Sequence, residues 1–151
     1  DDQGSKFDEK GNLKNWWQPE DAKAFKKLTQ SLVQQYNQFS PLPGLNVNGE
    51  LTLGENIADI SGLSVALKGL KLDMGTVSNE DAKLFFRSWA NNWRGKVRDN
   101  LMRTRLLVDP HSPYEYRTNG VVRNIPDFAK TYALEQKDGM YLAPENQVQI
   151  W

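Results

Sequence analysis

The chain has 151 residues, the usual length of one domain. Its 19 Lys and Arg residues balance 19 Asp and Glu residues, so the charge gives no reason to expect a nucleic-acid or anionic-membrane partner. The absence of cysteine excludes a disulfide framework, a thiolate zinc finger and a cysteine nucleophile, and no apolar run approaches the ~20 residues of a membrane span.

A polar segment precedes the first predicted helix. Residues 1–15 are polar and contain glycines, which predicts an exposed loop. Pro19 suits a first helical turn, where its missing N–H costs nothing, and Glu20 follows where the helix dipole favours negative charge. Apolar residues then recur every three or four positions until Pro41 interrupts the pattern. We therefore predict a helix over residues 19–39.

The next segment combines a turn signal with a second helix. Residues 45–53 alternate apolar and polar side chains around an Asn-Gly pair, which is typical of a tight hairpin turn, so we predict a short β-hairpin there. Thr52 followed by Glu55 matches the capping-box pattern. An apolar stripe predicts a helix from Glu55 to a break near Gly75.

Three further helices follow in the sequence. Ser78 with Asp81 three residues later is an N-cap signal, and an aromatic stripe continues from it to Trp93. Helical patterns also cover residues 97–107 and 126–132. The predicted fold class is mainly α, with at most one short β-hairpin.

Two carboxylates are the first candidate site. Glu55 and Asp59 are four residues apart on a predicted helix, so they share one face. Like charges at this spacing cost ~0.2–0.5 kcal/mol, which calls for a cation or a structural reason. A structural reason exists, because both acids lie near a helix N-terminus and Glu55 can close the capping box. Both interpretations stay open on spacing alone.

The remaining candidates also allow two interpretations. His111 is the single histidine and lies in a proline-rich turn, so it cannot form a histidine-rich zinc site by itself. Arg117 could orient a carboxylate or a substrate carbonyl, or be a solvated arginine. Trp16 and Trp17 could form a platform for sugar stacking, or pack against the rest of the domain.

Several motifs together resemble the neprilysin-type zinc endopeptidases. They are DDQG at 1–4, GNL and WW between 11 and 17, VNG at 47–49, LGENIAD at 53–59, and DPHSP at 109–113 with Arg117. Their order and spacing agree over essentially all 151 residues. GENIAD and HSP with a downstream arginine are the specific signals. The bacterial oligopeptidase branch, endopeptidase O, is the most similar, since the cysteines common in animal secreted members are absent.

The resemblance implies that residues 1–151 are the C-terminal part of a thermolysin-like zincin catalytic domain. In that family an HExxH helix supplies two zinc-binding histidines and the general-base glutamate, and it ends just before the stretch that matches Asp1-Asp2. Glu55 matches the third zinc ligand. Asp59 matches the carboxylate that holds a ligating histidine, a role that typically matters ~10–100-fold in metal affinity or activity.

The resemblance also gives roles to the two residues near the turn. His111 matches the histidine that stabilises the oxyanion formed when the peptide carbonyl is attacked. Arg117 matches the arginine that contacts the substrate backbone just after the cleaved bond, and it can also steady Asp59. The implied whole enzyme is a zinc endopeptidase that hydrolyses oligopeptides and holds one zinc ion.

The start of the chain at Asp1 rather than Met leads us to expect a piece of a longer polypeptide. Because the base and two zinc ligands of the family lie outside it, we expect residues 1–151 alone to be inactive and to lack zinc, and their partner to be the preceding part of the same polypeptide. The alternative is a non-catalytic helical interaction module that shares the scaffold, with tryptophans in its docking face. Self-association is expected under both hypotheses, and the compartment, bacterial cytoplasm or secretion, stays open.

Overall fold

The computed structural model describes residues 3–150, so the Asp1-Asp2 pair lies outside the described residues. The β pairing in this part of the chain consists of two isolated bridges. The helices are α1 (Pro19–Asn37), α2 (Leu53–Met74), α3 (Asn79–Asn92), α4 (Asp99–Val108), α5 (Tyr114–Val122) and α6 (Pro126–Thr131), with 3-10 turns at Gly4–Lys6 and Pro144–Asn146. The prediction of a mainly α fold is confirmed.

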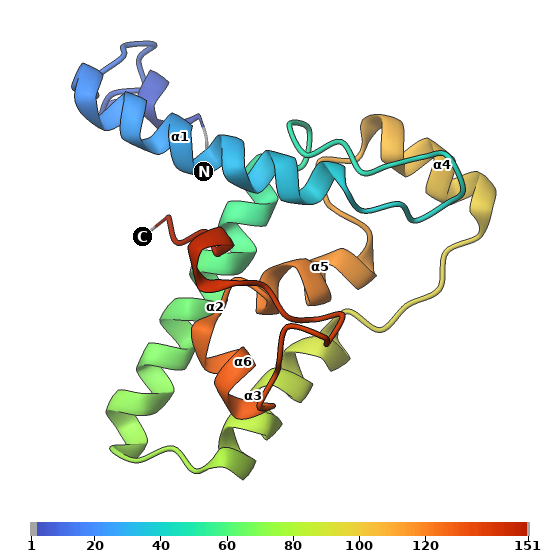
Figure 1. The fold of residues 1–151 in the computed structure, drawn as a ribbon. Helices are drawn as coiled ribbons and strands as arrows, with labels where there is room; N and C mark the ends of the chain where they lie inside the picture. The colour runs from blue at the N-terminus through green and yellow to red at the C-terminus, as the bar shows by residue number, and fades with distance from the viewer. Residues whose placement is uncertain (1–2, 151) are drawn as a thin grey trace.

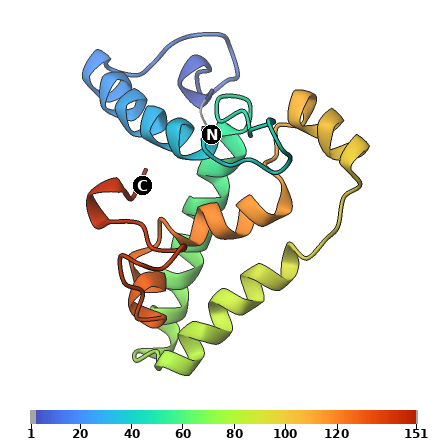
Figure 2. The same cartoon turned by 45° about the vertical axis from the view of Figure 1, so that its right-hand side comes forward.

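The helices are arranged around α2 and α5. In Figure 1, α1 crosses the N-terminal end of α2, and α3 returns from its C-terminal end. The turned view in Figure 2 shows α5 between α2 and α3. Accordingly α5 contacts α1, α2 and α3, and α6 packs on α3. The start of α2 and the segment before α5 are therefore brought together, although they lie far apart in sequence.

The core holds this arrangement through α1, α2 and α5. Leu32 and Tyr36 of α1, Ile57 of α2 and Val121 of α5 are fully buried. A Cβ at Gly120 of α5 would lie 2.8 Å from the Tyr36 hydroxyl oxygen, so glycine is what lets these two helices approach. The sequence does not predict α5, because the apolar stripe of this helix is short and is interrupted by Gly120, which weakens a helical pattern.

The other helices agree with the predictions to within about two residues. Pro19 begins α1 as predicted. The capping box of α3 is formed: the Ser78 hydroxyl accepts a hydrogen bond from the Asp81 backbone N–H, and the Asp81 carboxylate accepts one from the Ser78 N–H, each at 3.2 Å. This signal located the start of α3 because both partners lie within one turn.

The predicted hairpin at residues 45–53 is wrong. The Asn48 side-chain oxygen accepts hydrogen bonds from the backbone N–H groups of Glu50 and Leu51, both at 3.1 Å, and a turn forms that leads directly into α2. Gly49 packs against the Val33 carbonyl of α1, where a Cβ would not fit. Packing on α1 and an Asn side-chain turn therefore replace the strand pairing that the Asn-Gly pair favours.

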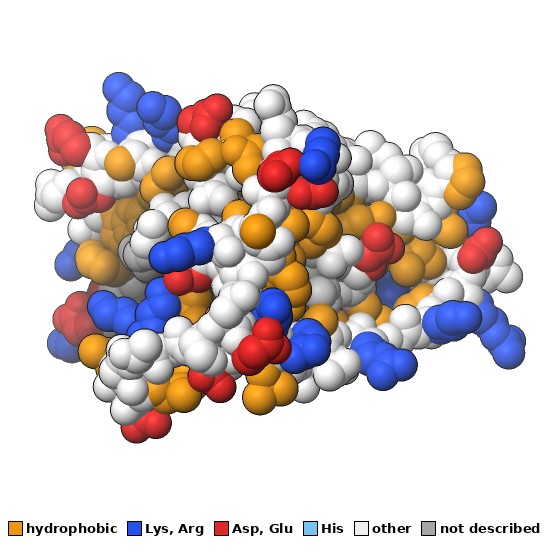
Figure 3. All heavy atoms as spheres, turned by 60° about the horizontal axis from the view of Figure 1, so that its bottom comes forward, with side chains coloured by type: hydrophobic (Ala, Val, Ile, Leu, Met, Phe, Trp, Pro, Cys, Tyr) orange, Lys and Arg blue, Asp and Glu red, His pale blue; other side chains and the backbone are white. Residues whose placement is uncertain are grey.

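Large hydrophobic side chains also lie on the surface. They include Leu13, Trp16, Val65, Leu72, Leu84, Leu107 and Val108. Figure 3 shows hydrophobic side chains in several groups among charged ones on one face of the molecule. Within residues 3–150, no helix is both long enough and apolar enough to cross a membrane.

Candidate functional site

The two acidic candidates lie on the first two turns of α2. The Asp59 side chain is 8% exposed and the Glu55 side chain is 41% exposed. The predicted capping box at Thr52 is wrong, because the Thr52 hydroxyl donates to the Asn48 carbonyl at 3.1 Å and caps no helix N–H. The preceding turn continues into the helix and makes such a cap unnecessary. The Glu55 carboxylate is therefore not used to start α2.

Arg117 of α5 binds Asp59 through two parallel hydrogen bonds. Its Nε and Nη2 each lie 2.7 Å from a different Asp59 oxygen, which is the bidentate geometry that guanidinium and carboxylate favour. The guanidinium also lies over the Trp93 ring, 3.8 Å from its centroid. Burial opposes the charged form, but the hydrogen bonds to Asp59 and the charges of Asp59 and Glu55 raise the pKa of Arg117.

His111 lies opposite Glu55. Its Nε2 is 3.4 Å from Glu55 Oε2, and the same oxygen is 4.0 Å from Arg117 Nη2. The other ring nitrogen, Nδ1, is 2.8 Å from Asp109 Oδ1. Both ring nitrogens thus face carboxylate oxygens, and an imidazolium can donate to both. The structure brings all four predicted site residues together at the start of α2.

Asp109 is a further residue of the site, and the sequence indicated no role of its own for it beyond its place in the DPHSP motif. Its Oδ1 also accepts the His111 backbone N–H at 3.0 Å, and its Oδ2 lies 3.8 Å from Arg105. Partial burial opposes ionisation, but the His111 hydrogen bonds and the Arg105 charge lower the pKa of Asp109. A carboxylate two residues before the single histidine was the signal that could have identified it.

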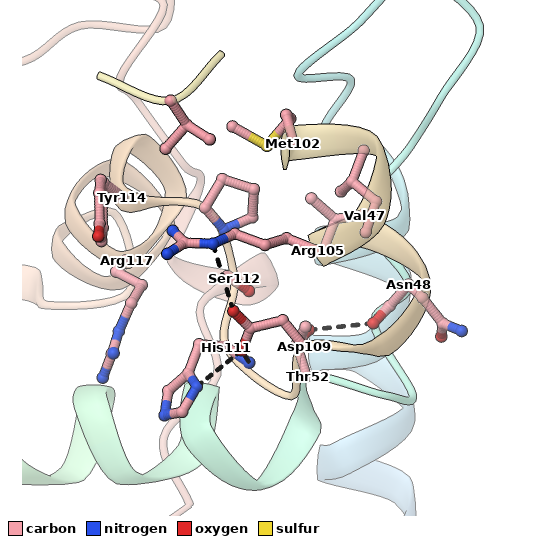
Figure 4. Close-up of a pocket in the computed structure, with 13 residues that line it drawn as sticks. Val47, Asn48, Thr52, Met102, Arg105, Asp109, His111, Ser112, Tyr114 and Arg117 are labelled. Atoms are coloured by element: carbon pink, nitrogen blue, oxygen red, sulfur yellow. Dashed lines mark hydrogen bonds and ion pairs between the residues drawn. The ribbon is translucent and has the colours of Figure 1, made fainter. Parts of the chain in front are cut away.

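A cavity of about 190 Å³ borders this cluster. Its apolar wall includes Met102 and Leu106 of α4, and its polar wall includes His111 and Arg117. In Figure 4 the side chains of His111 and Arg117 point toward α2, and a dashed line joins His111 to Asp109. The His111 and Arg117 side of the cluster is therefore accessible from a hollow with both apolar and hydrogen-bonding walls.

Glu55 is the carboxylate of the cluster with the most freedom to bind a metal, because Arg117 binds both Asp59 oxygens, and the Asp109 oxygens face His111 and Arg105. Zinc in proteins takes carboxylate oxygen, imidazole nitrogen or thiolate sulfur as ligands, usually three or four from protein. Within residues 3–150, no group of three or more His, Cys, Asp or Glu side chains is placed to hold a metal ion. Glu55, whose side chain is partly exposed and has no capping role, fits as one member of such a ligand set.

Four tryptophans lie in two places, one pair before α1 and one pair at the C-terminal end of α3. Trp17 packs edge-on against Phe25 of α1, with ring centroids 4.9 Å apart, as the packing interpretation predicts. Trp16 is exposed, and its Nε1 donates to the Gly4 carbonyl at 3.1 Å. Trp89 of α3 donates to the Arg117 carbonyl at 3.2 Å and contacts Trp93. Trp89 and Trp93 therefore help to hold the backbone and guanidinium of Arg117.

Comparisons with known proteins find one family of peptidases along essentially the whole chain. The family model described as Peptidase family M13 matches residues 1–148. The neutral endopeptidase of Lactobacillus helveticus is 37% identical over 153 residues, which cover 100% of this chain and 22% of that protein. Endothelin-converting enzyme 1 of Rattus norvegicus is 34% identical over 160 residues, which cover 100% of this chain and 21% of that protein.

Solved structures agree with these relatives. The zinc metalloprotease Zmp1 of Mycobacterium tuberculosis, in complex with an inhibitor, matches with a TM-score of 0.93 and 40% identity over 100% of this chain and 25% of that chain. PepO of Lactobacillus rhamnosis matches with a TM-score of 0.87 and 36% identity over 98% of this chain and 23% of that chain. The chain thus spans a quarter or less of the length of each of these relatives.

Proposed function

The chain belongs to peptidase family M13, and we propose that it is part of a zinc-dependent endopeptidase that cleaves oligopeptides. The observation that carries this proposal is the cluster in which Glu55 Oε2 lies 3.4 Å from His111 Nε2 and 4.0 Å from Arg117 Nη2. In the proposal, this chain supplies one zinc ligand and the groups that hold the substrate carbonyls. An HExxH segment, outside this chain, supplies the other two zinc ligands and the general base.

Glu55 is the proposed zinc ligand, and Asp59 is the proposed hydrogen-bond partner of a ligating histidine. When bound, zinc polarises the peptide carbonyl as a Lewis acid and lowers the pKa of a water molecule. Arg117 takes one hydrogen-bonding position on each Asp59 oxygen, and a carboxylate oxygen has two. Asp59 can therefore still accept a hydrogen bond from a ligating histidine and fix its orientation.

His111 and Arg117 are the proposed substrate-binding groups. In its doubly protonated form, His111 donates through Nδ1–H to Asp109, and this hydrogen bond orients the ring so that Nε2–H can donate to a developing oxyanion. One such donor is worth on the order of 10²–10³ in rate in comparable sites. Asp59 engages Nε and one N–H of Nη2, so the other donors of the Arg117 guanidinium can bind a substrate carbonyl.

The proposal predicts that the purified chain has no peptidase activity and that the activity returns when the HExxH segment is joined to it. The measurement is the cleavage of a quenched fluorescent peptide with added zinc. We expect none from residues 1–151 and chelator-sensitive cleavage from the joined polypeptide. Chelator-sensitive turnover by residues 1–151 alone would overturn the proposed division of the site.

Zinc affinity tests the ligand directly. In the joined polypeptide, Glu55→Gln should weaken zinc binding by more than the ~10–100-fold that is typical of an orienting partner, because it replaces an anionic carboxylate ligand with a neutral amide. Glu20→Gln is the matched control, because Glu20 also lies in the first turn of a helix, α1, and is exposed. Equal zinc affinity of the Glu55→Gln and parent proteins would show that Glu55 is not a ligand.

The alternative is a non-catalytic helical module that shares the scaffold. It predicts that the joined polypeptide does not cleave the fluorescent peptide. A coding sequence that continues upstream of Asp1 into an HExxH motif would support the peptidase, and a start codon at that point would support the module.

A further inference from the structure

A buried polar network connects α2 to the segment that carries His111. The Ser112 hydroxyl donates to the Asn56 side-chain oxygen at 2.8 Å, and the Asn56 amide donates to the Thr52 hydroxyl at 2.9 Å. Asn56 is 1% exposed and Ser112 is 3% exposed. Buried polar groups are costly to leave unpaired, so this network specifies one arrangement of the two segments.

The network lies directly beside the candidate site. Asn56 follows Glu55 on α2, and Ser112 follows His111. Glu55 and His111 are themselves partly exposed, so burial does not fix the 3.4 Å between them. The hydrogen bond between their sequence neighbours, Asn56 and Ser112, is buried, and it connects α2 to the His111 segment at this position.

We propose that Asn56 and Ser112 are positioning residues that hold His111 opposite Glu55. The Asp59–Arg117 pair fixes α5, which directly follows the His111 segment, to α2 one turn further along. A single attachment would allow the His111 segment to pivot about Arg117, whereas two attachments hold its distance and direction. Functional side chains need to be held within about 0.5 Å of the productive geometry, and buried hydrogen bonds behind them are the usual means.

The chain itself allows a direct test, because His111 is its single histidine and its ring signals in NMR spectra need no assignment among histidines. The measurement is the set of NOEs between the His111 ring protons and the Glu55 side chain in residues 1–151 at one neutral pH. In Ser112→Ala we expect these NOEs to weaken or disappear. Ser112→Thr keeps the hydroxyl and should restore them.

Ser61→Ala is the matched control. Ser61 lies on α2, as Asn56 does, and its buried hydroxyl has no hydrogen-bond partner in the structure. Ser61→Ala therefore removes a buried hydroxyl without breaking a hydrogen bond. It should leave the His111 NOEs unchanged. If Ser112→Ala does not fold, as judged by circular dichroism, Ser112→Cys retains the side-chain volume with a weaker donor and carries the same expectation. Unchanged His111 NOEs in the folded variant would overturn the proposal.

The catalytic consequence rests on the proposed function. In the joined polypeptide, Ser112→Ala should lower kcat about 10-fold with little change in KM, because the proposed oxyanion donor is displaced while Arg117 still binds the substrate. Ser61→Ala should change neither constant. An inactive parent would contradict the proposed peptidase and leave the NOE result standing. An active parent whose kcat is insensitive to Ser112→Ala would contradict the positioning role.

Discussion

Two carboxylates on one helix face have different physical environments. Asp59 is buried and takes two hydrogen bonds from Arg117, whereas Glu55 is partly exposed and faces His111 at 3.4 Å. The same α-helical spacing therefore produces one group whose charge the fold depends on and one group that is available to a ligand. Mutations should separate these two properties.

Asp59→Asn should destabilise the chain strongly. It removes the charge of the bidentate partner of the Arg117 guanidinium, whose side chain is 13% exposed, and leaves only the more distant Glu55 carboxylate at 4.0 Å; breaking a buried ion pair in this way costs about 3 kcal/mol or more. Urea unfolding of residues 1–151 measures the change in the free energy of unfolding. Glu55→Gln is the control and should change it by less than about 0.5 kcal/mol, because that side chain is exposed enough to be solvated. Equal effects of the two changes would contradict this division.

The sequence predicts the local spacing of the site residues but not the contacts that distant packing gives them. The spacing of Glu55 and Asp59 was enough to place both on one face, because helical periodicity is a local property. The capping interpretation of Glu55 was wrong, since it depended on the turn before α2, which packing on α1 determines. The role of Asp109 beside His111 depends on side-chain directions within a loop, which the sequence does not encode as a period.

At the scale of elements, local signals were sufficient where the partners lie within one turn. Pro19 and the Ser78–Asp81 pair located two helix starts correctly. Signals that depend on distant packing were not sufficient. The Asn-Gly pair forms no hairpin because Gly49 packs on α1, and α5 was missed because Gly120 accommodates Tyr36 from another helix.

The contribution of the α3 cap to stability can be tested by mutation. Ser78→Ala removes the acceptor for the Asp81 N–H and should lower the free energy of unfolding by about 1 kcal/mol. Ser88→Ala is the control, because Ser88 is exposed within the same helix and alanine is the better helix former. It should be neutral or slightly stabilising. Thermal or urea unfolding of both variants provides the comparison, and a neutral Ser78→Ala would show that α3 is held by tertiary packing alone.

At the scale of the whole molecule, α2 has more apolar surface than this chain covers. Ile60, Leu63 and Leu67 are buried, whereas Val65 is 69% exposed and Leu72 is 77% exposed. A helix with apolar side chains around its whole circumference is typical of the interior of a larger protein. Val65 also lines a groove of about 810 Å³ between α2, the start of α6 and residues 144–149. We therefore expect the preceding part of the polypeptide to cover this side of α2.

Val65→Arg tests that expectation, because it places a charge on the side of α2 that we expect to be covered. In residues 1–151 the variant should change the free energy of unfolding by less than about 0.5 kcal/mol, since Val65 is exposed there. Its affinity for the preceding segment, supplied as a separate polypeptide and measured by titration calorimetry, should fall at least about 10-fold, because an unpaired charge is costly to bury. Thr104→Arg, at an exposed position of α4, adds the same charge and should bind like the parent. If Val65→Arg also binds like the parent, the exposed side of α2 is not the surface that joins the two parts.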